Sequence, residues 1–183
     1  MGCGVAAEMG RITGRREVTE RAQWQGDDAE GGWSGRDLAG AVEPLEDVVP
    51  SGEVYDWYQR GLQLLDGGNP AAASQLLARA ALKAPRSRSI LESLARAQFD
   101  AEQYREAMVA FRTLADSNPQ DDYAQFGWGL AAARLGEYEA AVDHLAKAAA
   151  MRPDVRYYAQ ALRGARATVR ARAAADYKPS GPL

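Results

Sequence analysis

The chain contains 183 residues, with 22 basic and 25 acidic side chains and a net charge of −3 at pH 7, which fits one domain with flanking tails. The single cysteine, Cys3, excludes a disulfide within the chain, and the single histidine, His144, excludes most zinc sites, which need about four ligands. No apolar run approaches the ~18 residues that cross a membrane, and residues 1–10 lack the apolar core of a secretory signal. We therefore expect a cytoplasmic protein that binds no membrane, metal or cofactor.

Residues 1–50 are predicted to form a disordered, acidic, glycine-rich head. The first 53 residues hold five arginines against eleven acidic residues, together with ten of the 18 glycines. Their apolar residues follow no sustained period, so the segment cannot bury enough surface to offset the entropy of ordering it. Two alternatives stay open, a short helix near residues 36–42 and a start codon assigned upstream of the native one.

A repeat begins after the head. Pro85, Pro119 and Pro153 are spaced by 34 residues. Blocks of this length cover residues 54–87, 88–121 and 122–155. Aligned blocks superimpose small residues in two columns and large apolar residues in a third, namely Gly61, Ala95 and Gly129, then Ala73, Ala107 and Ala141, then Leu77, Phe111 and Leu145. Small side chains at a fixed spacing indicate helices that cross closely, because a larger residue would force them apart.

Each block divides into two helix-length apolar patterns. In the first block Trp57, Gly61 and Leu64 recur at i, i+4 and i+7, which places them on one helical stripe. The run 67–70, Gly-Gly-Asn-Pro, then predicts the end of this helix and the start of the next, with asparagine as N-cap and proline in the first turn. The second block has no glycine at the corresponding turn, residues 100–102. That turn is therefore its weakest match to the pattern.

A capping helix is predicted over residues 156–172 and a flexible tail over 173–183. One stripe of the helix is apolar and should cover the third block, because a stack of repeats leaves an apolar face at its end. This stripe consists of Ala161, Leu162, Ala165 and Val169. The opposite face is basic, with Arg156, Arg163, Arg166 and Arg170. We interpret it as a solvated helix face.

With this period and these columns, residues 54–155 resemble the tetratricopeptide repeat. The resemblance implies an all-α fold, a right-handed solenoid of three helix–turn–helix repeats followed by the capping helix. It also implies that the first helix of each repeat lines a concave groove that binds a partner. It does not extend over residues 1–50.

The resemblance assigns a set of partner-binding residues to the groove: Tyr55, Tyr58, Leu62, Leu65, Glu92, Arg96, Phe99, Tyr123, Phe126, Leu130 and Arg134. We expect Tyr55, Tyr58, Tyr123 and Phe126 to be exposed there, since aromatic side chains dominate interaction hot spots. The alternative is that some of the leucines are simply packed. A clamp for chaperone C-terminal tails is not expected, because the clamp positions carry no cation.

No catalytic motif is present. The sequence has neither a phosphate-binding loop nor a nucleophile elbow. We therefore predict a non-enzymatic interaction module that binds a protein or peptide. Two alternatives stay open, a self-assembling structural module such as a homodimer, and a nucleic-acid-associated factor that uses the basic C-terminal helix, although nucleic-acid binding is not the favoured interpretation. The alanine- and arginine-rich composition resembles that of high-GC bacteria such as actinobacteria.

Overall fold

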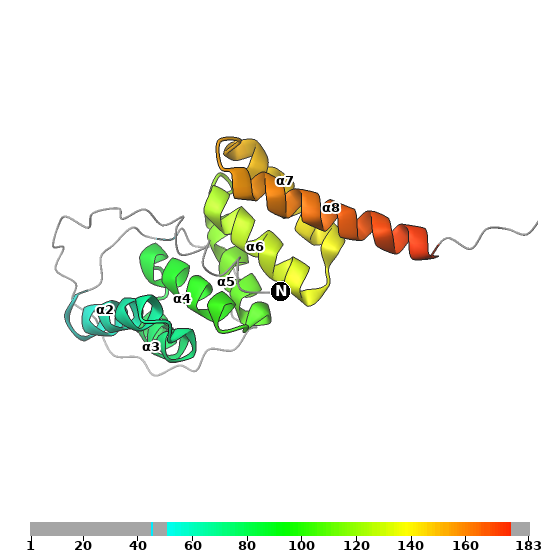
Figure 1. The fold of residues 1–183 in the computed structure, drawn as a ribbon. Coiled ribbons are helices and arrows are strands. Elements are labelled where there is room, and N and C mark those ends of the chain that lie inside the picture. The colour runs from blue at the N-terminus through cyan, green and yellow to red at the C-terminus, as the bar shows by residue number, and fades with distance from the viewer. Residues whose placement is uncertain (1–44, 46–50, 177–183) are drawn as a thin grey trace, which may run out of the picture.

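The computed structural model describes residue 45 and residues 51–176. The predictions of a disordered head over 1–50 and of a flexible tail beyond residue 176 concern positions outside the described residues, except at Leu45. Within the described part the chain forms seven α-helices (Figure 1). They are α2 (Gly52–Asp66), α3 (Pro70–Lys83), α4 (Arg88–Asp100), α5 (Tyr104–Ser117), α6 (Asp122–Leu135), α7 (Tyr138–Met151) and α8 (Arg156–Asp176).

The helices stack as successive antiparallel pairs. Each helix packs against the next one along the chain, and α2 also contacts α4, α4 contacts α6, and α6 contacts α8. The first helices of the pairs therefore form one layer and α3, α5 and α7 form the other (Figure 1). This arrangement confirms the predicted all-α solenoid. No helix among the described residues is long and apolar enough to cross a membrane.

Positive backbone φ angles mark the turn inside each pair. They occur at Gly68 (φ 75°), Glu102 (φ 61°) and Gly136 (φ 85°), three positions separated by 34 residues. Glycine adopts this left-handed conformation without steric cost, whereas a residue with a Cβ atom does not. The second pair therefore has the same turn as the others despite its missing glycine, with Glu102 in the unfavourable conformation.

The small columns lie where the two helices of a pair cross. A Cβ atom built on Gly61 would lie 2.7 Å from Leu77 Cγ, and one on Gly129 would lie 2.7 Å from Leu145 Cγ. On the second helices Ala73, Ala107 and Ala141 are completely buried. The predicted close crossing is thus observed in the packing, and the side chain it excludes is identified.

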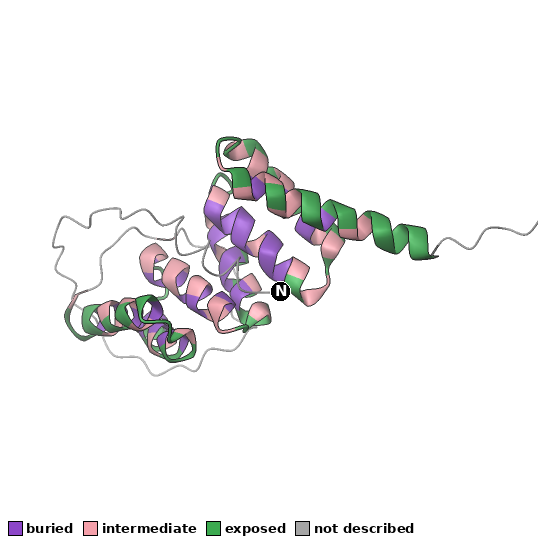
Figure 2. Ribbon diagram, in the orientation of Figure 1, coloured by how far each residue is buried: buried purple, intermediate pink, exposed green. Residues whose placement is uncertain are grey.

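Helix α8 covers the end of the stack, as predicted, but it extends to Asp176 rather than ending at residue 172. Tyr158 anchors its first turn, because the ring is fully buried and stacks on Phe126 at 4.4 Å between centroids. The Tyr158 hydroxyl donates a hydrogen bond of 2.8 Å to Asp122 Oδ2. Nearer the other end, Arg172 lies over the Tyr138 ring at 4.4 Å and donates a 3.1 Å hydrogen bond to the Gly136 carbonyl. Most of the outer face of α8 is exposed (Figure 2).

Candidate partner-binding groove

The predicted groove residues lie on α2, α4 and α6, the layer of first helices, but most of the aromatic ones are not exposed. Tyr55 is 38% exposed, whereas Tyr58, Tyr123 and Phe126 retain only 9%, 8% and 3% of their accessible surface. The expectation that these three rings stand free in the groove is therefore wrong. Figure 2 shows α6 as the most enclosed helix of the layer.

Neighbouring helices account for this burial. The Tyr58 hydroxyl is hydrogen-bonded by Ser89 and Ser93 of α4, and burial raises its pKa. The Phe126 ring is enclosed by Tyr157 and Tyr158 of α8. A position that faces along the layer of first helices is thus filled by the next first helix, and the last repeat is filled by the capping helix.

The aliphatic members of the predicted set divide in the same way. Leu65, Phe99 and Leu130 are buried, at 7%, 3% and 7% exposure, while Leu62 is half-buried. The alternative in which some of these leucines are packed is therefore correct for Leu65 and Leu130. Their role is to support the groove wall.

A half-buried polar cluster lies in the middle of the groove. Arg96 and Asp100, one turn apart on α4, approach to 3.8 Å between Nε and Oδ2. The Tyr123 hydroxyl of α6 lies near this pair. The atoms Arg96 Nε, Asp100 Oδ1 and Tyr123 Oη are buried and have no hydrogen-bond partner among the described residues. Unpaired buried polar atoms are costly, so the cluster is built to accept further hydrogen bonds.

Burial also perturbs the acid of this cluster. The pKa of the Asp100 carboxyl rises from 3.8 to about 6 because desolvation disfavours its charged form, and the nearby Arg96 guanidinium opposes that rise only in part. Burial raises the pKa of the Tyr123 hydroxyl far above its usual value, so it stays a hydrogen-bond donor. Asp100 is not among the committed groove residues, although its position four residues after Arg96 marks it.

Two further features complete the groove. Arg134 is exposed, and its guanidinium lies 5.9 Å from the Phe99 ring centre and 5.7 Å from that of Tyr104. Beyond it a hollow of about 430 Å³ separates α6 from α8. Its lining includes the predicted residues Phe126, Leu130 and Arg134 together with Tyr157 and Gln160 of α8. Sequence reasoning missed the contribution of α8, since it treated that helix only as a cap.

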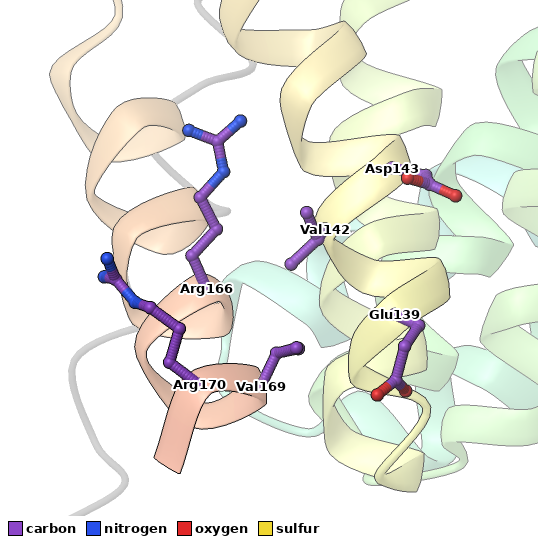
Figure 3. A pocket seen from close by; sticks show the side chains of 6 residues that line it. All are labelled: Glu139, Val142, Asp143, Arg166, Val169 and Arg170. Atoms are coloured by element: carbon purple, nitrogen blue, oxygen red, sulfur yellow. The ribbon is translucent and has the colours of Figure 1, made fainter. Parts of the chain in front are cut away.

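A second hollow, of about 370 Å³, opens between α7 and α8 outside the groove. Figure 3 shows Glu139 and Asp143 on the α7 wall, with Arg166 and Arg170 on the α8 wall. Val142 of α7 lines its floor together with Val169 of α8. The arginines that were interpreted as a solvated face thus line one wall of a hollow whose other wall is acidic.

Catalytic groups are not brought together. His144 Nδ1 lies 2.8 Å from Gln125 Oε1, and its ring stacks on Trp128 at 3.6 Å. Burial, with the nearby Lys147 ammonium, lowers the His144 pKa. Among the described residues no three metal-ligating side chains cluster. The histidine is held as a packing element between α6 and α7.

The sequence matches no model of a known family and no curated protein. Solved structures are similar to it. The MamA protein from Desulfovibrio magneticus RS-1 (residues 41 to end) superposes with a TM-score of 0.61 and 20% identity over 63% of this chain and 66% of that one. The first TPR domain of Spaghetti (RPAP3), bound to an HSP90 peptide, gives 0.60 and 16% over 66% and 96%.

A third similar structure, the Sgt2 TPR domain from Aspergillus fumigatus, gives a TM-score of 0.63 and 17% identity over 77% of this chain and 94% of that one. The chain spans slightly less than two thirds of the MamA chains, at 65% and 66% of their lengths. At these identities the likeness concerns the fold. Together with the 34-residue register of the helix pairs, it shows that the protein has the tetratricopeptide-repeat fold.

Proposed function

We propose that the protein is a non-enzymatic interaction module that holds a peptide or protein partner in the groove lined by α2, α4 and α6. The observation that carries this proposal is the polar cluster of Arg96, Asp100 and Tyr123, whose buried atoms lack hydrogen-bond partners on the floor of an elongated surface. A bound main chain would supply both donors and acceptors to these atoms. The adjoining hollow between α6 and α8 would accept an apolar side chain.

The burial pattern revises the set of direct contacts. Exposed or half-buried positions can touch a partner, which selects Tyr55, Leu62, Glu92, Arg96 and Arg134 from the predicted set. The buried Tyr58, Tyr123 and Phe126 hold the wall, apart from the Tyr123 hydroxyl. The RPAP3 domain with its HSP90 peptide supports the general mode of binding. The chaperone-tail specificity is not proposed, since Tyr58, Leu62 and Tyr123 occupy three of the clamp positions.

The test starts from a pull-down with the full chain as bait, followed by affinity measurements on the captured partner. Tyr55→Ala and Arg134→Glu should each weaken binding by about 1–2 kcal/mol, which is roughly 5- to 30-fold. Val109→Ala is the matched control, because Val109 is 41% exposed on α5, in the other layer. All variants should retain the helical circular dichroism of the parent.

Each other outcome has a defined meaning. Wild-type affinity in both groove variants, or a loss confined to Val109→Ala, would refute the groove as the binding surface. Capture of a second copy alone would favour the self-assembling module, which light scattering detects. A capture of nucleic acid that weakens with salt would favour the basic face of α8.

A further inference from the structure

Leu45 is the one described residue outside 51–176, and it packs away from its neighbours in sequence. The apolar core consists of two clusters, one built from α2, α3 and α4 and one from the helices α4 to α8. Leu45 precedes α2 by only a few residues, yet it is half-buried against the second cluster. The chain ahead of α2 must therefore reach back over the later repeats.

The length of the connection limits where Leu45 can lie. Six residues link it to Ser51, the N-cap of α2, and a fully extended stretch of that length spans about 20 Å. Because each helix pair is antiparallel, α2, α4 and α6 begin at the same edge of the stack. Neighbouring helices are about 8–10 Å apart, so α6 is about 20 Å from α2. Leu45 can thus reach the second cluster only near the start of α4 or α6, where Leu91 and Tyr123 lie.

The sequence around Leu45 suits the groove in charge and in shape. Residues 41–50, AVEPLEDVVP, contain three acidic and no basic side chains. The groove offers the exposed guanidinium of Arg134, the Arg96 Nε without a partner and the Tyr123 hydroxyl donor. The prolines at 44 and 50 also favour an extended backbone in the residues that precede them.

We propose that residues 41–50, anchored by Leu45, occupy the groove of their own chain as an intramolecular ligand that a partner must displace. This inference rests on the proposed function of the groove and adds its regulation and the chemistry of its partner. The partner is then an acidic, extended peptide with an apolar anchor, able to take the place of Leu45. The intramolecular segment lowers the apparent affinity of every such partner by the fraction of chains in which it is bound.

The experiment supplies the segment in trans. The chain 51–183 is the receptor, and it contains every described residue of both core clusters, with Leu45 outside them. The probes are a synthetic peptide of residues 38–50 and the same peptide with Leu45→Asp. Calorimetry gives the affinity, and amide chemical shifts give the contacted helices. Chain 51–183 should bind the parent peptide with shifts at Arg96, Tyr123 and Leu130, and with none at the exposed Leu82 of α3 or Val109 of α5.

Two comparisons make the result specific. The Leu45→Asp peptide should bind about tenfold more weakly or worse, since it loses the apolar anchor. The full chain should bind the parent peptide about tenfold more weakly than chain 51–183, and Leu45→Asp in the full chain should restore that binding. Equal affinity of the two peptides, equal affinity of the two chains, shifts on α5 or α7, or no binding would each overturn the inference.

Failure of this inference is separable from failure of the proposed function. If the peptide does not bind but the captured partner still responds to Tyr55→Ala and Arg134→Glu, the groove binds a partner and only the intramolecular ligand is wrong. If the partner responds to neither substitution, the groove itself is not the binding surface.

Discussion

The turn at Glu102 offers a direct test of how the repeat determines backbone conformation. Glu102 has a φ of 61°, at the position where the other two repeats carry Gly68 and Gly136. A residue with a Cβ atom pays roughly 1–2 kcal/mol in this region. Replacement by glycine removes that cost but adds about 0.4–1 kcal/mol of entropy to the unfolded chain. Glu102→Gly should therefore stabilise the protein by about 0.5–1 kcal/mol.

The assay is thermal and urea unfolding followed by circular dichroism, where this change raises the midpoint by roughly 2–4 °C. Ala101→Gly is the matched control, since Ala101 has a φ of −83° and glycine there only adds unfolded-state entropy. It should destabilise the protein, so adjacent glycines act in opposite directions. Glu102→Ala keeps the Cβ atom and isolates the effect of the charge. A Glu102→Gly variant that is no more stable than Glu102→Ala would refute the reasoning.

Two other predictions concern packing and pH. Gly61→Leu should destabilise the first repeat by roughly 1–3 kcal/mol, because even a Cβ atom would lie 2.7 Å from Leu77 Cγ. Gly164→Ala, in a helical position with no atom within 4 Å, should instead stabilise by about 0.5–1 kcal/mol, and urea unfolding that gave both changes the same sign would contradict the assigned crossing. The raised pKa of Asp100 means that its charged form is disfavoured in the folded state. Its contribution to stability is therefore fully present below pH 3.8 and is lost as the pH rises through about 6. Asp100→Asn should remove this loss, so its unfolding free energy relative to wild type should rise over that range; a constant difference would show that Asp100 is well solvated.

The exposed face of the groove could be predicted only in part. The spacing of Tyr55, Leu62 and Arg96 places them correctly on the layer of first helices, because side-chain direction on a helix follows from sequence position. Tyr123 and Phe126 have the same direction, yet they are buried, because α4 and α8 supply side chains that cover them. Periodicity gives the direction of a side chain, whereas exposure depends on the neighbour that faces it.

The helices and their register follow from the sequence, because helix ends and close crossings depend on local residue types repeated every 34 positions. Gly61 and Gly129 mark the crossings, and Gly68 and Gly136 mark the turns. The left-handed Glu102 was not apparent, since only the packing of the repeats on either side forces that turn on a residue without the matching preference. The polar cluster, the hollow beside α8 and the position of Leu45 also required the assembled stack. Each of them joins residues from different repeats or from beyond the repeats, and no local pattern encodes such contacts.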